Sequence, residues 1–290
     1  MIAVARRERP GPVWAAPAVV FFVAFAILPV IGVVYLSFTS WNGLGDPVWL
    51  GADNWAAMAD DPELGNGFTI TLTLTVISWL FQTPLALLIG VWAAGPQRNR
   101  AVLSTLFFLP LLLSTAAISL TFVSLLDPNF GLASKFGDGN LLGDPDRALY
   151  VIAFVIAWQF IPFHTLLYQS ATRQIPASLY EAASIDGATG VRQFFAITLP
   201  QLRNTIIASS VLMLVGSFTY FETILLMTNG GPGTATRVLP LHMYAKGFVG
   251  FDMGYASALA VLLVVAGATL SIVVVRSTGY HRMASDREGA

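Results

Sequence analysis

Six apolar runs, each long enough to cross a lipid bilayer as a helix, constrain this sequence more than any other feature. They cover residues 13–38, 68–94, 102–126, 149–169, 205–228 and 255–275. A helix needs about 20 apolar residues to span the ~30 Å hydrocarbon core of a membrane. The runs therefore predict an all-α integral membrane protein, in which residues 1–290 form a single domain with six transmembrane helices.

The composition excludes several other classes of protein. Only 11% of the residues are charged, against roughly 25% in an average soluble domain, and the mean hydropathy is +0.70. Disordered chains are poor in apolar residues, whereas 56% of this chain is hydrophobic. The net charge of −1, without a concentrated basic tract, argues against a nucleic-acid partner. The absence of cysteine excludes disulfides, cysteine nucleophiles and cysteine-ligated metal sites.

The second run contains a pattern that, read alone, is typical of a β-strand. Thr69, Thr71, Thr73 and Thr75 alternate with apolar residues, as they would in a half-buried strand. The apolar pattern then continues without a turn, well beyond the length of a strand. A helix satisfies its own backbone groups in lipid, and threonine hydroxyls can bond to carbonyls one turn earlier. We therefore predict a helix here.

The first run admits a second interpretation, because Arg6, Arg7 and Arg9 precede it as basic residues precede the core of a secretion signal. The apolar core of a signal peptide is about 7–15 residues long, and this run is longer. In addition, no clear small-x-small cleavage site follows Pro29. We favour a retained membrane helix over a cleaved signal.

The distribution of basic residues predicts how the chain is oriented, because cytoplasmic loops of membrane proteins are enriched in arginine and lysine. With the N-terminus inside, 11 of the 15 basic residues fall in cytoplasmic segments. The four in the outer loops are Lys135, Arg147, Arg237 and Lys246. Both termini are therefore expected in the cytoplasm. In the first outer loop, Asp60, Asp61 and Glu63 are expected to form a solvated face.

The cytoplasmic loop 170–204 is much longer than the 2 to 8 residues that usually connect packed helices. Pro176 suits the first position of a helix, and Gly187 suits a left-handed terminator. A second short helix is expected over 191–199, ended by Pro200. Helices of about ten residues are marginal alone in water, so this loop is expected to need a partner surface.

The same loop carries a spaced motif. It reads Glu181-Ala182-Ala183, three residues, Gly187, nine residues, and Ile197-Thr198-Leu199-Pro200. This motif resembles the signature loop of bacterial ABC importer permeases, and Asp186 with Ala188 completes the Asp-Gly-Ala core typical of the sugar-importer branch. In that family the loop forms a coupling helix that docks into a groove on the cytoplasmic ATPase.

The resemblance thus implies an ATPase-coupling role for a defined set of residues. They are Glu181, Ala182, Ala183, Asp186, Gly187, Ile197, Leu199 and Pro200. The alternative for this loop is a pair of amphipathic helices that lie on the bilayer surface without a protein partner.

A second block, residues 226–258, is similar to the end of the permease core in carbohydrate importers of the maltose and glycerol-phosphate type. It contains Leu226-Met227-Thr228-Asn229-Gly230-Gly231-Pro232, Tyr244, Phe248 and Gly254-Tyr255-Ala256-Ser257-Ala258. The resemblance implies a type I ABC importer permease in a bacterial plasma membrane. It also implies a second related permease subunit, a cytoplasmic ATPase dimer, an extracytoplasmic solute-binding protein and a carbohydrate substrate as partners.

Polar and aromatic residues of the third, fourth and fifth runs are candidates for the substrate pathway, since transporter sites tend to lie near the bilayer midplane. Counting from the ends of the runs places Thr115, Gln159 and Ser217 there. The resemblance implies pathway positions at Leu111, Thr115, Gln159, Phe160, Phe163, Ser217 and Tyr220. Glu222 joins this set because an unpaired carboxylate in the membrane costs several kcal/mol unless it has a function. For Glu222 the alternative is an ion pair with the partner permease subunit. For the other residues the alternative is packing between helices, which we favour for His164.

The source of energy follows from what the chain lacks. A phosphate-binding loop needs Gly-Lys followed by Ser or Thr, but the two lysines follow Ser134 and Ala245. We therefore expect a transport subunit that is not an enzyme and binds no cofactor, with ATP and magnesium held by the partner ATPase. The alternative is a stand-alone, ion-coupled secondary transporter that uses Glu222.

Overall fold

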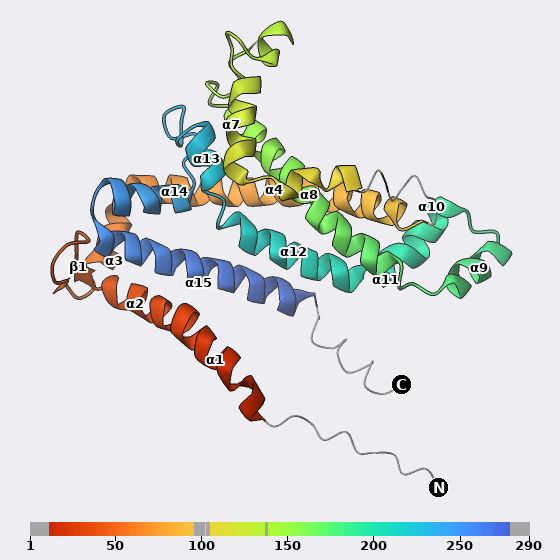
Figure 1. Ribbon diagram of the computed structural model, residues 1–290, viewed down its shortest axis with the longest axis horizontal. Coiled ribbons are helices and arrows are strands. Elements are labelled where there is room, and N and C mark those ends of the chain that lie inside the picture. Colours follow the sequence, from red (N-terminus) through yellow and green to blue (C-terminus); the bar gives the residue numbers. More distant parts are fainter. Residues whose placement is uncertain (1–11, 96–101, 103–104, 137–138, 279–290) are drawn as a thin grey trace. The chain divides into compact units, whose positions relative to one another are not determined.

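The computed structural model describes residues 12–95, 102, 105–136 and 139–278, which are mostly helical (Figure 1). Two compact units share the chain. The first unit contains described residues 12–60 and 243–262, and the second contains residues 61–242 and those from 263 onward.

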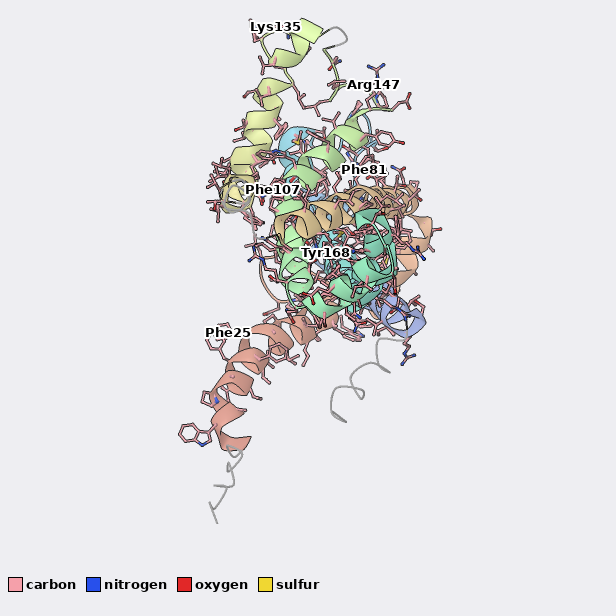
Figure 2. All side chains as sticks on the ribbon, turned by 90° about the vertical axis from the view of Figure 1, so that its right-hand side faces the viewer. Phe25, Phe81, Phe107, Lys135, Arg147 and Tyr168 are labelled. Atoms are coloured by element: carbon pink, nitrogen blue, oxygen red, sulfur yellow. The ribbon has the colours of Figure 1, made fainter. Side chains whose placement is uncertain are left out.

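The first unit begins with a long helical segment and continues into a small hairpin. Its elements are η1 (Pro12–Ala15), α1 (Ala16–Phe22), the π-helical turn η2 (Val23–Ile27), α2 (Leu28–Leu36), β1 (Thr39–Ser40), β2 (Val48–Trp49), α3 (Asp53–Ala57), η3 (Met58–Asp60) and the π-helical turn η6 (Ala245–Val249). The strands are antiparallel, with Thr39 opposite Trp49. Along the N-terminal helix the side chains are largely exposed, as Figure 2 shows for Phe25, which suits a helix surrounded by lipid.

A close backbone contact explains one glycine of the block 226–258. A Cβ atom at Gly254 would overlap the carbonyl oxygen of Thr39. The same carbonyl accepts a hydrogen bond of 2.8 Å from Nδ2 of buried Asn54, which also donates to the carbonyl of Ser37 at 3.0 Å. Gly254 therefore allows the start of α15 (Met253–Ser277) to approach the first hairpin strand.

The second unit is built around two long helices. Its elements are α4 (Pro62–Ala93), α6 (Leu109–Leu112), α7 (Thr115–Leu125), η4 (Leu132–Phe136), α8 (Ala148–Thr172), α9 (Ala177–Ile185), α10 (Gly190–Gln193), the π-helical turn η5 (Phe194–Thr198), α11 (Leu199–Gln201), α12 (Arg203–Ser217) and α13 (Glu222–Met227). Helix α14 (Leu239–Tyr244) begins in the second unit and ends in the first, and α15 passes from the first unit into the second.

Helices α4 and α8 pack closely because a glycine faces a tyrosine at their contact. A Cβ atom at Gly90 would lie 2.7 Å from Cβ of Tyr168 and 2.9 Å from the carbonyl oxygen of Thr165. Tyr168 is fully buried among the helices of this unit (Figure 2). The small residue therefore lets the two backbones approach, as is common in helix packing within membranes.

The prediction of a helix over the threonine-rich part of the second run is confirmed. Thr69, Thr71, Thr73 and Thr75 all lie within α4. Each hydroxyl donates to the carbonyl oxygen four residues earlier, at 2.7 to 2.9 Å. These bonds satisfy the hydroxyls within the helix itself, as the sequence predicted.

Within the described residues, four of the six expected spans are long apolar helices. They are Ala16–Leu36, Pro62–Ala93, Ala148–Thr172 and Met253–Ser277. In 102–126 and 205–228 the described residues are helical with an interruption in each region, and residues 103 and 104 lie outside the described part of the chain. In the first, Ser114 is extended (φ −67°, ψ 143°) and its Oγ accepts from the Ala117 amide at 3.2 Å. In the second, residues 218–221 separate α12 from α13.

The interruptions have a physical basis in the residues around them. Besides the Ser114 cap, the Thr219 hydroxyl donates to the carbonyl oxygen of Gly216 at 2.7 Å. Side-chain hydroxyls can thus form hydrogen bonds with backbone groups where a helix breaks. Such breaks are tolerated at membrane depth where they line a cavity. Hydropathy alone does not distinguish a broken apolar segment from a continuous one.

Two of the three acidic residues expected in a solvated face are instead paired. The Asp61 carboxylate lies 2.9 Å from Nε2 of His242, which is buried, and the Glu63 carboxylate lies 2.8 Å from the Arg237 guanidinium. Asp61 also caps α4 by accepting from the Glu63 amide at 2.9 Å. These contacts join the start of α4 to residues 237–242, so the expectation holds only for exposed Asp60.

Candidate functional site

The segment that follows α8 forms a helix, a turn and a further helical stretch, as the loop sequence predicted. Helix α9 begins after Pro176, which is its N-cap and not its first residue. The second helical stretch runs through α10, η5 and α11, and it is not ended by Pro200. Pro200 is the second residue of α11, which directly follows the π-helical turn η5. The chain then continues directly into α12.

Gly187 ends α9 in the left-handed conformation that the sequence predicted, with φ +74°. Its amide donates to the carbonyl oxygen of Ser184 at 3.1 Å, and the Ala188 amide donates to that of Ala183 at 2.9 Å. These two bonds form a Schellman motif, which satisfies the last carbonyls of a helix and requires a positive φ at this position. Gly187 therefore fixes the direction in which the chain leaves α9.

Side-chain contacts hold α9 against the helical stretch that follows it. The hydroxyls of Tyr180 and Thr198 lie 2.9 Å apart. Nε2 of Gln193 donates to Ser184 Oγ at 3.0 Å and to the carbonyl oxygen of Ala188 at 3.1 Å. A nine-residue helix is too short to be stable alone, so these bonds give α9 a fixed position.

The residues expected to couple to an ATPase divide into two groups. The exposed ones are Glu181, Ala182, Asp186, Gly187 and Pro200, and the partly buried ones are Ala183, Ile197 and Leu199. Leu199 packs against a buried cluster that includes Tyr168 and Leu202. The first group thus forms part of an open surface, whereas Leu199 anchors the segment to the helices.

Two exposed apolar side chains enlarge the surface around Gly187. Ile185 is 88% exposed and Val191 is 72% exposed, one on each side of the turn. Val191 has no position in the motif of residues 181–200. Its apolar character next to the turn is the signal that identifies it in the sequence.

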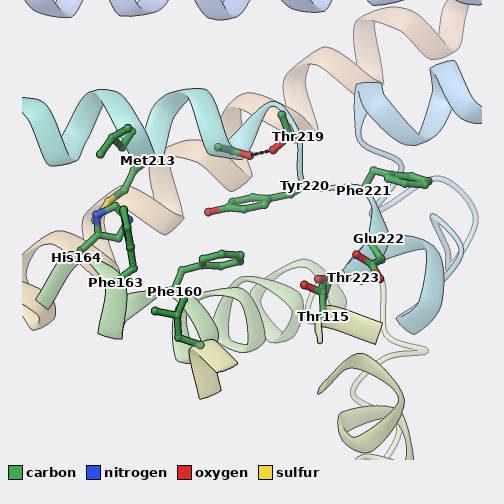
Figure 3. Close-up of a pocket in the computed structure, with 13 residues that line it drawn as sticks. Thr115, Phe160, Phe163, His164, Met213, Thr219, Tyr220, Phe221, Glu222 and Thr223 are labelled. Carbon is green, nitrogen blue, oxygen red and sulfur yellow. Dashed lines mark hydrogen bonds between the residues drawn. The ribbon is translucent and has the colours of Figure 1, made fainter. Parts of the chain in front are cut away.

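A pocket of about 360 Å³ lies where α12 breaks before α13 (Figure 3). Its walls come from α6, α7, α8, α12, α13 and the connection 218–221. The lining residues are Leu111, Thr115, Phe160, Phe163, His164, Leu212, Met213, Gly216, Thr219, Tyr220, Phe221, Glu222 and Thr223. The lining is therefore largely apolar and aromatic with a few polar groups, the usual character of a small-molecule site.

Aromatic rings occupy the middle of the pocket and polar groups one end. The rings of Phe160 and Tyr220 are stacked, with 5.7 Å between centroids. Figure 3 shows Glu222, Thr223 and Thr115 together at one end and His164 at the other. This arrangement offers an apolar platform flanked by hydrogen-bonding groups.

Six of the eight residues expected on the substrate pathway line this pocket. They are Leu111, Thr115, Phe160, Phe163, Tyr220 and Glu222. The other two, Gln159 and Ser217, are buried beside it. Gln159 Nε2 donates to Thr115 Oγ1 at 3.1 Å, and Ser217 Oγ lies 2.7 Å from Thr75 Oγ1. Their polar groups thus bond to neighbouring helices and support the lining.

Several residues around the break line the pocket although the sequence did not predict it. They are Thr219, Phe221 and Thr223, and in a continuous helix Phe221 would point away from the other two. His164 was expected to be a packing residue, and it does bond to Ser209 Oγ at 2.8 Å, yet it also lines the pocket. The polar residues at 219–223, inside an otherwise apolar run, are the signal that could have located the break.

Helices α8 and α12 connect the pocket to the segment around α9. Helix α12 has 15 residues, so it is about 22 Å long. Its first residues adjoin α11, and its last residues line the pocket. Likewise, α8 contributes Phe160 and Phe163 to the pocket and ends next to α9.

One protein-family model matches residues 86–281, a range that contains both the α9–α11 segment and the pocket. The family is described as the inner membrane component of binding-protein-dependent transport systems. The match covers about two thirds of the chain, since the whole sequence has 290 residues.

Individual relatives match along nearly the full length. A probable ABC transporter permease protein of Bacillus subtilis (YurN) is 32% identical over 268 residues, covering 89% of this chain and 91% of the relative. The multiple sugar-binding transport system permease protein MsmF of Streptococcus mutans is 29% identical, with 88% and 90% covered.

Among solved structures, a chain of a bacterial ABC transporter involved in the import of the acidic polysaccharide alginate has the same fold. The TM-score is 0.81 at 24% identity, and the match covers 93% of this chain and 94% of that one. The chain described here therefore belongs to the family of inner membrane components of binding-protein-dependent transport systems, and it is a permease subunit of an ABC importer.

Proposed function

We propose that this permease forms half of the pathway for a carbohydrate and couples it to a separate ATPase through residues 176–200. The observation that supports a carbohydrate cargo is the stacked pair of Phe160 and Tyr220, which lies beside the hydroxyls of Thr115, Thr219 and Thr223. Sugar rings have apolar faces and hydroxyl edges, so an aromatic platform next to polar groups matches both. The name of the Streptococcus mutans relative, a multiple sugar-binding transport system permease protein, supports the same cargo.

The coupling role is supported by the shape of the α9–α11 segment. An ordered turn at Gly187, exposed Glu181 and Asp186, and the apolar side chains of Ile185 and Val191 provide a surface suited to a protein groove. In this proposal, closure of the ATP-bound ATPase dimer moves α9, and α8 and α12 carry the movement to the pocket. The pocket then changes the side of the membrane to which it opens.

The remaining parts of the assembly follow from this role. A second, related permease completes the pathway, and an extracytoplasmic solute-binding protein delivers the cargo. ATP and magnesium bind to the ATPase, so this chain is a transport subunit without catalytic residues or a cofactor of its own. Both termini lie in the cytoplasm of a bacterial cell, as does the α9–α11 segment.

Co-purification tests the proposed assembly. The chain is tagged at its C-terminus, native membranes are solubilised mildly, and the bound proteins are identified by mass spectrometry. We expect an ATPase subunit and a second six-span permease in comparable amounts. Glu181→Arg reverses the charge on the exposed face of α9 and is expected to remove the ATPase while keeping the second permease. Recovery of the chain alone, stable and active, would contradict the proposal.

A further inference from the structure

The pocket contains one carboxylate and no basic side chain apart from a histidine. Glu222 is the first residue of α13 and is exposed, and no lysine or arginine is among the lining residues in the described part of the chain. His164 lies at the opposite end of the pocket, with Nδ1 2.8 Å from Ser209 Oγ (Figure 3). The local charge next to the hydroxyls of Thr115 and Thr223 is therefore negative.

Arginines of this unit that approach the outer end of the helices are paired elsewhere. Arg237 lies 2.8 Å from Glu63, and Arg147 lies 3.1 Å from Asp144. Neither side chain lines the pocket. The Glu222 carboxylate thus faces the cavity without a compensating cation from the lining.

This charge has a direct consequence for what can occupy the cavity. Two like charges a few ångströms apart repel each other, even in bulk water. Sites that bind carboxylates, sulfonates or phosphates normally present arginine, lysine or backbone donors to them. A carboxylate can accept a hydrogen bond from a sugar hydroxyl or pair with an ammonium group, but it repels an anionic sugar.

We infer that the pathway of this importer admits uncharged or cationic carbohydrates and rejects anionic ones, and that Glu222 sets this selectivity. The inference rests on the proposed function, because it specifies the charge class of the carbohydrate. It also separates this permease from the structurally similar transporter named for the acidic polysaccharide alginate. Glu222 acts on specificity, while the aromatic platform provides the general affinity for sugar rings.

The absence of cysteine from this chain permits a direct test of the charge in the pocket. Thr219→Cys introduces one thiol into the lining, and the assembled transporter is treated with a cationic or an anionic methanethiosulfonate reagent. Mass spectrometry of this chain gives the two labelling rates, and the labelling ratio is the rate with the cationic reagent divided by the rate with the anionic reagent. It is expected to fall by about tenfold when Glu222→Gln is added, because the field of the carboxylate acts with opposite sign on the two reagents.

Two controls make the labelling result specific. Asn129→Cys lies after the end of α7, is exposed and does not line the pocket, and its labelling ratio is expected to be unaffected by Glu222→Gln. Glu222→Asp retains the charge and is expected to retain a high ratio at Thr219→Cys. A ratio at Thr219→Cys that is the same with glutamate and glutamine would overturn the inference, including the case in which the partner permease supplies a compensating cation.

Uptake by the same assembly separates failure of the inference from failure of the proposed function. The probes are short oligosaccharides of mannose and their uronic forms, which differ only in a hydroxymethyl or a carboxylate at C6. Preference for the neutral form is expected to decrease by about tenfold in Glu222→Gln. ATP-driven uptake with an unchanged preference would reject the role of Glu222 and leave the proposed function standing. The labelling ratio could also respond to Glu222→Gln in an assembly that takes up no carbohydrate with ATP. That result would confirm the negative charge in the pocket and reject the proposed cargo.

Discussion

Replacing Gly187 with proline is expected to abolish substrate-stimulated ATP hydrolysis by the assembled transporter. Proline holds φ near −65° and has no amide hydrogen. It can therefore adopt neither the φ of +74° at this position nor the bond to the carbonyl oxygen of Ser184. The chain would leave α9 in another direction, and the surface around Ile185 and Val191 would be lost. Stimulated hydrolysis by purified complexes in nanodiscs is the measurement.

Alanine variants provide the matched controls for this prediction. The left-handed conformation costs an alanine at position 187 about 1–2 kcal/mol. Gly187→Ala is therefore expected to reduce the stimulation of ATP hydrolysis without abolishing it. Gly190 lies three residues away, has ordinary backbone angles, and has no atom within 4 Å of an added Cβ. Gly190→Ala is therefore expected to behave as wild type. Full stimulation in Gly187→Pro would show that the Schellman turn has no part in coupling.

Replacing Tyr220 with alanine is expected to reduce carbohydrate uptake by about tenfold or more, equivalent to ~1.4 kcal/mol or more. The substitution removes the ring that stacks on Phe160 at 5.7 Å and leaves the pocket without its central platform. Tyr220→Phe retains the ring and loses only the hydroxyl, so a smaller decrease is expected. Uptake into proteoliposomes, normalised to the amount of assembled complex, is the measurement.

Tyr150→Ala is the matched control for the pocket variant. Tyr150 is on α8 in the same unit, is 59% exposed, and does not line the pocket. We expect normal uptake from it. Equal uptake by Tyr220→Ala and wild type would show that the aromatic platform has no role in carbohydrate uptake. This conclusion does not depend on the result for the α9–α11 segment.

Local chemistry explains which features could be predicted from the sequence. The four threonines of α4 bond within their own helix, and Gly187 has the left-handed conformation that its place after an apolar helix implies. Both results depend on interactions within one turn of the chain. The four long apolar helices were likewise visible because hydrophobicity over about 20 residues is a strong signal.

Features that depend on other parts of the molecule were missed. The break at 218–221 interrupts an apolar run, and hydropathy averaged over the run did not identify the lining residues Thr219 and Thr223, although the polar residues at 219–223 mark the place. The partner of Asp61 is His242, 181 residues later in the chain. No local pattern predicts such a contact, which forms only when α4 packs against residues 237–242.

A separate ATPase is proposed to drive transport through this permease. The most direct measurement is uptake by the reconstituted complex when ATP is withheld, or when an uncoupler collapses the ion gradient. We expect uptake to stop without ATP and to continue with the uncoupler, and Gly187→Pro to resemble the ATP-free sample. Uptake that persists without ATP, stops with the uncoupler and is lost in Glu222→Gln would contradict the account and identify an ion-coupled transporter.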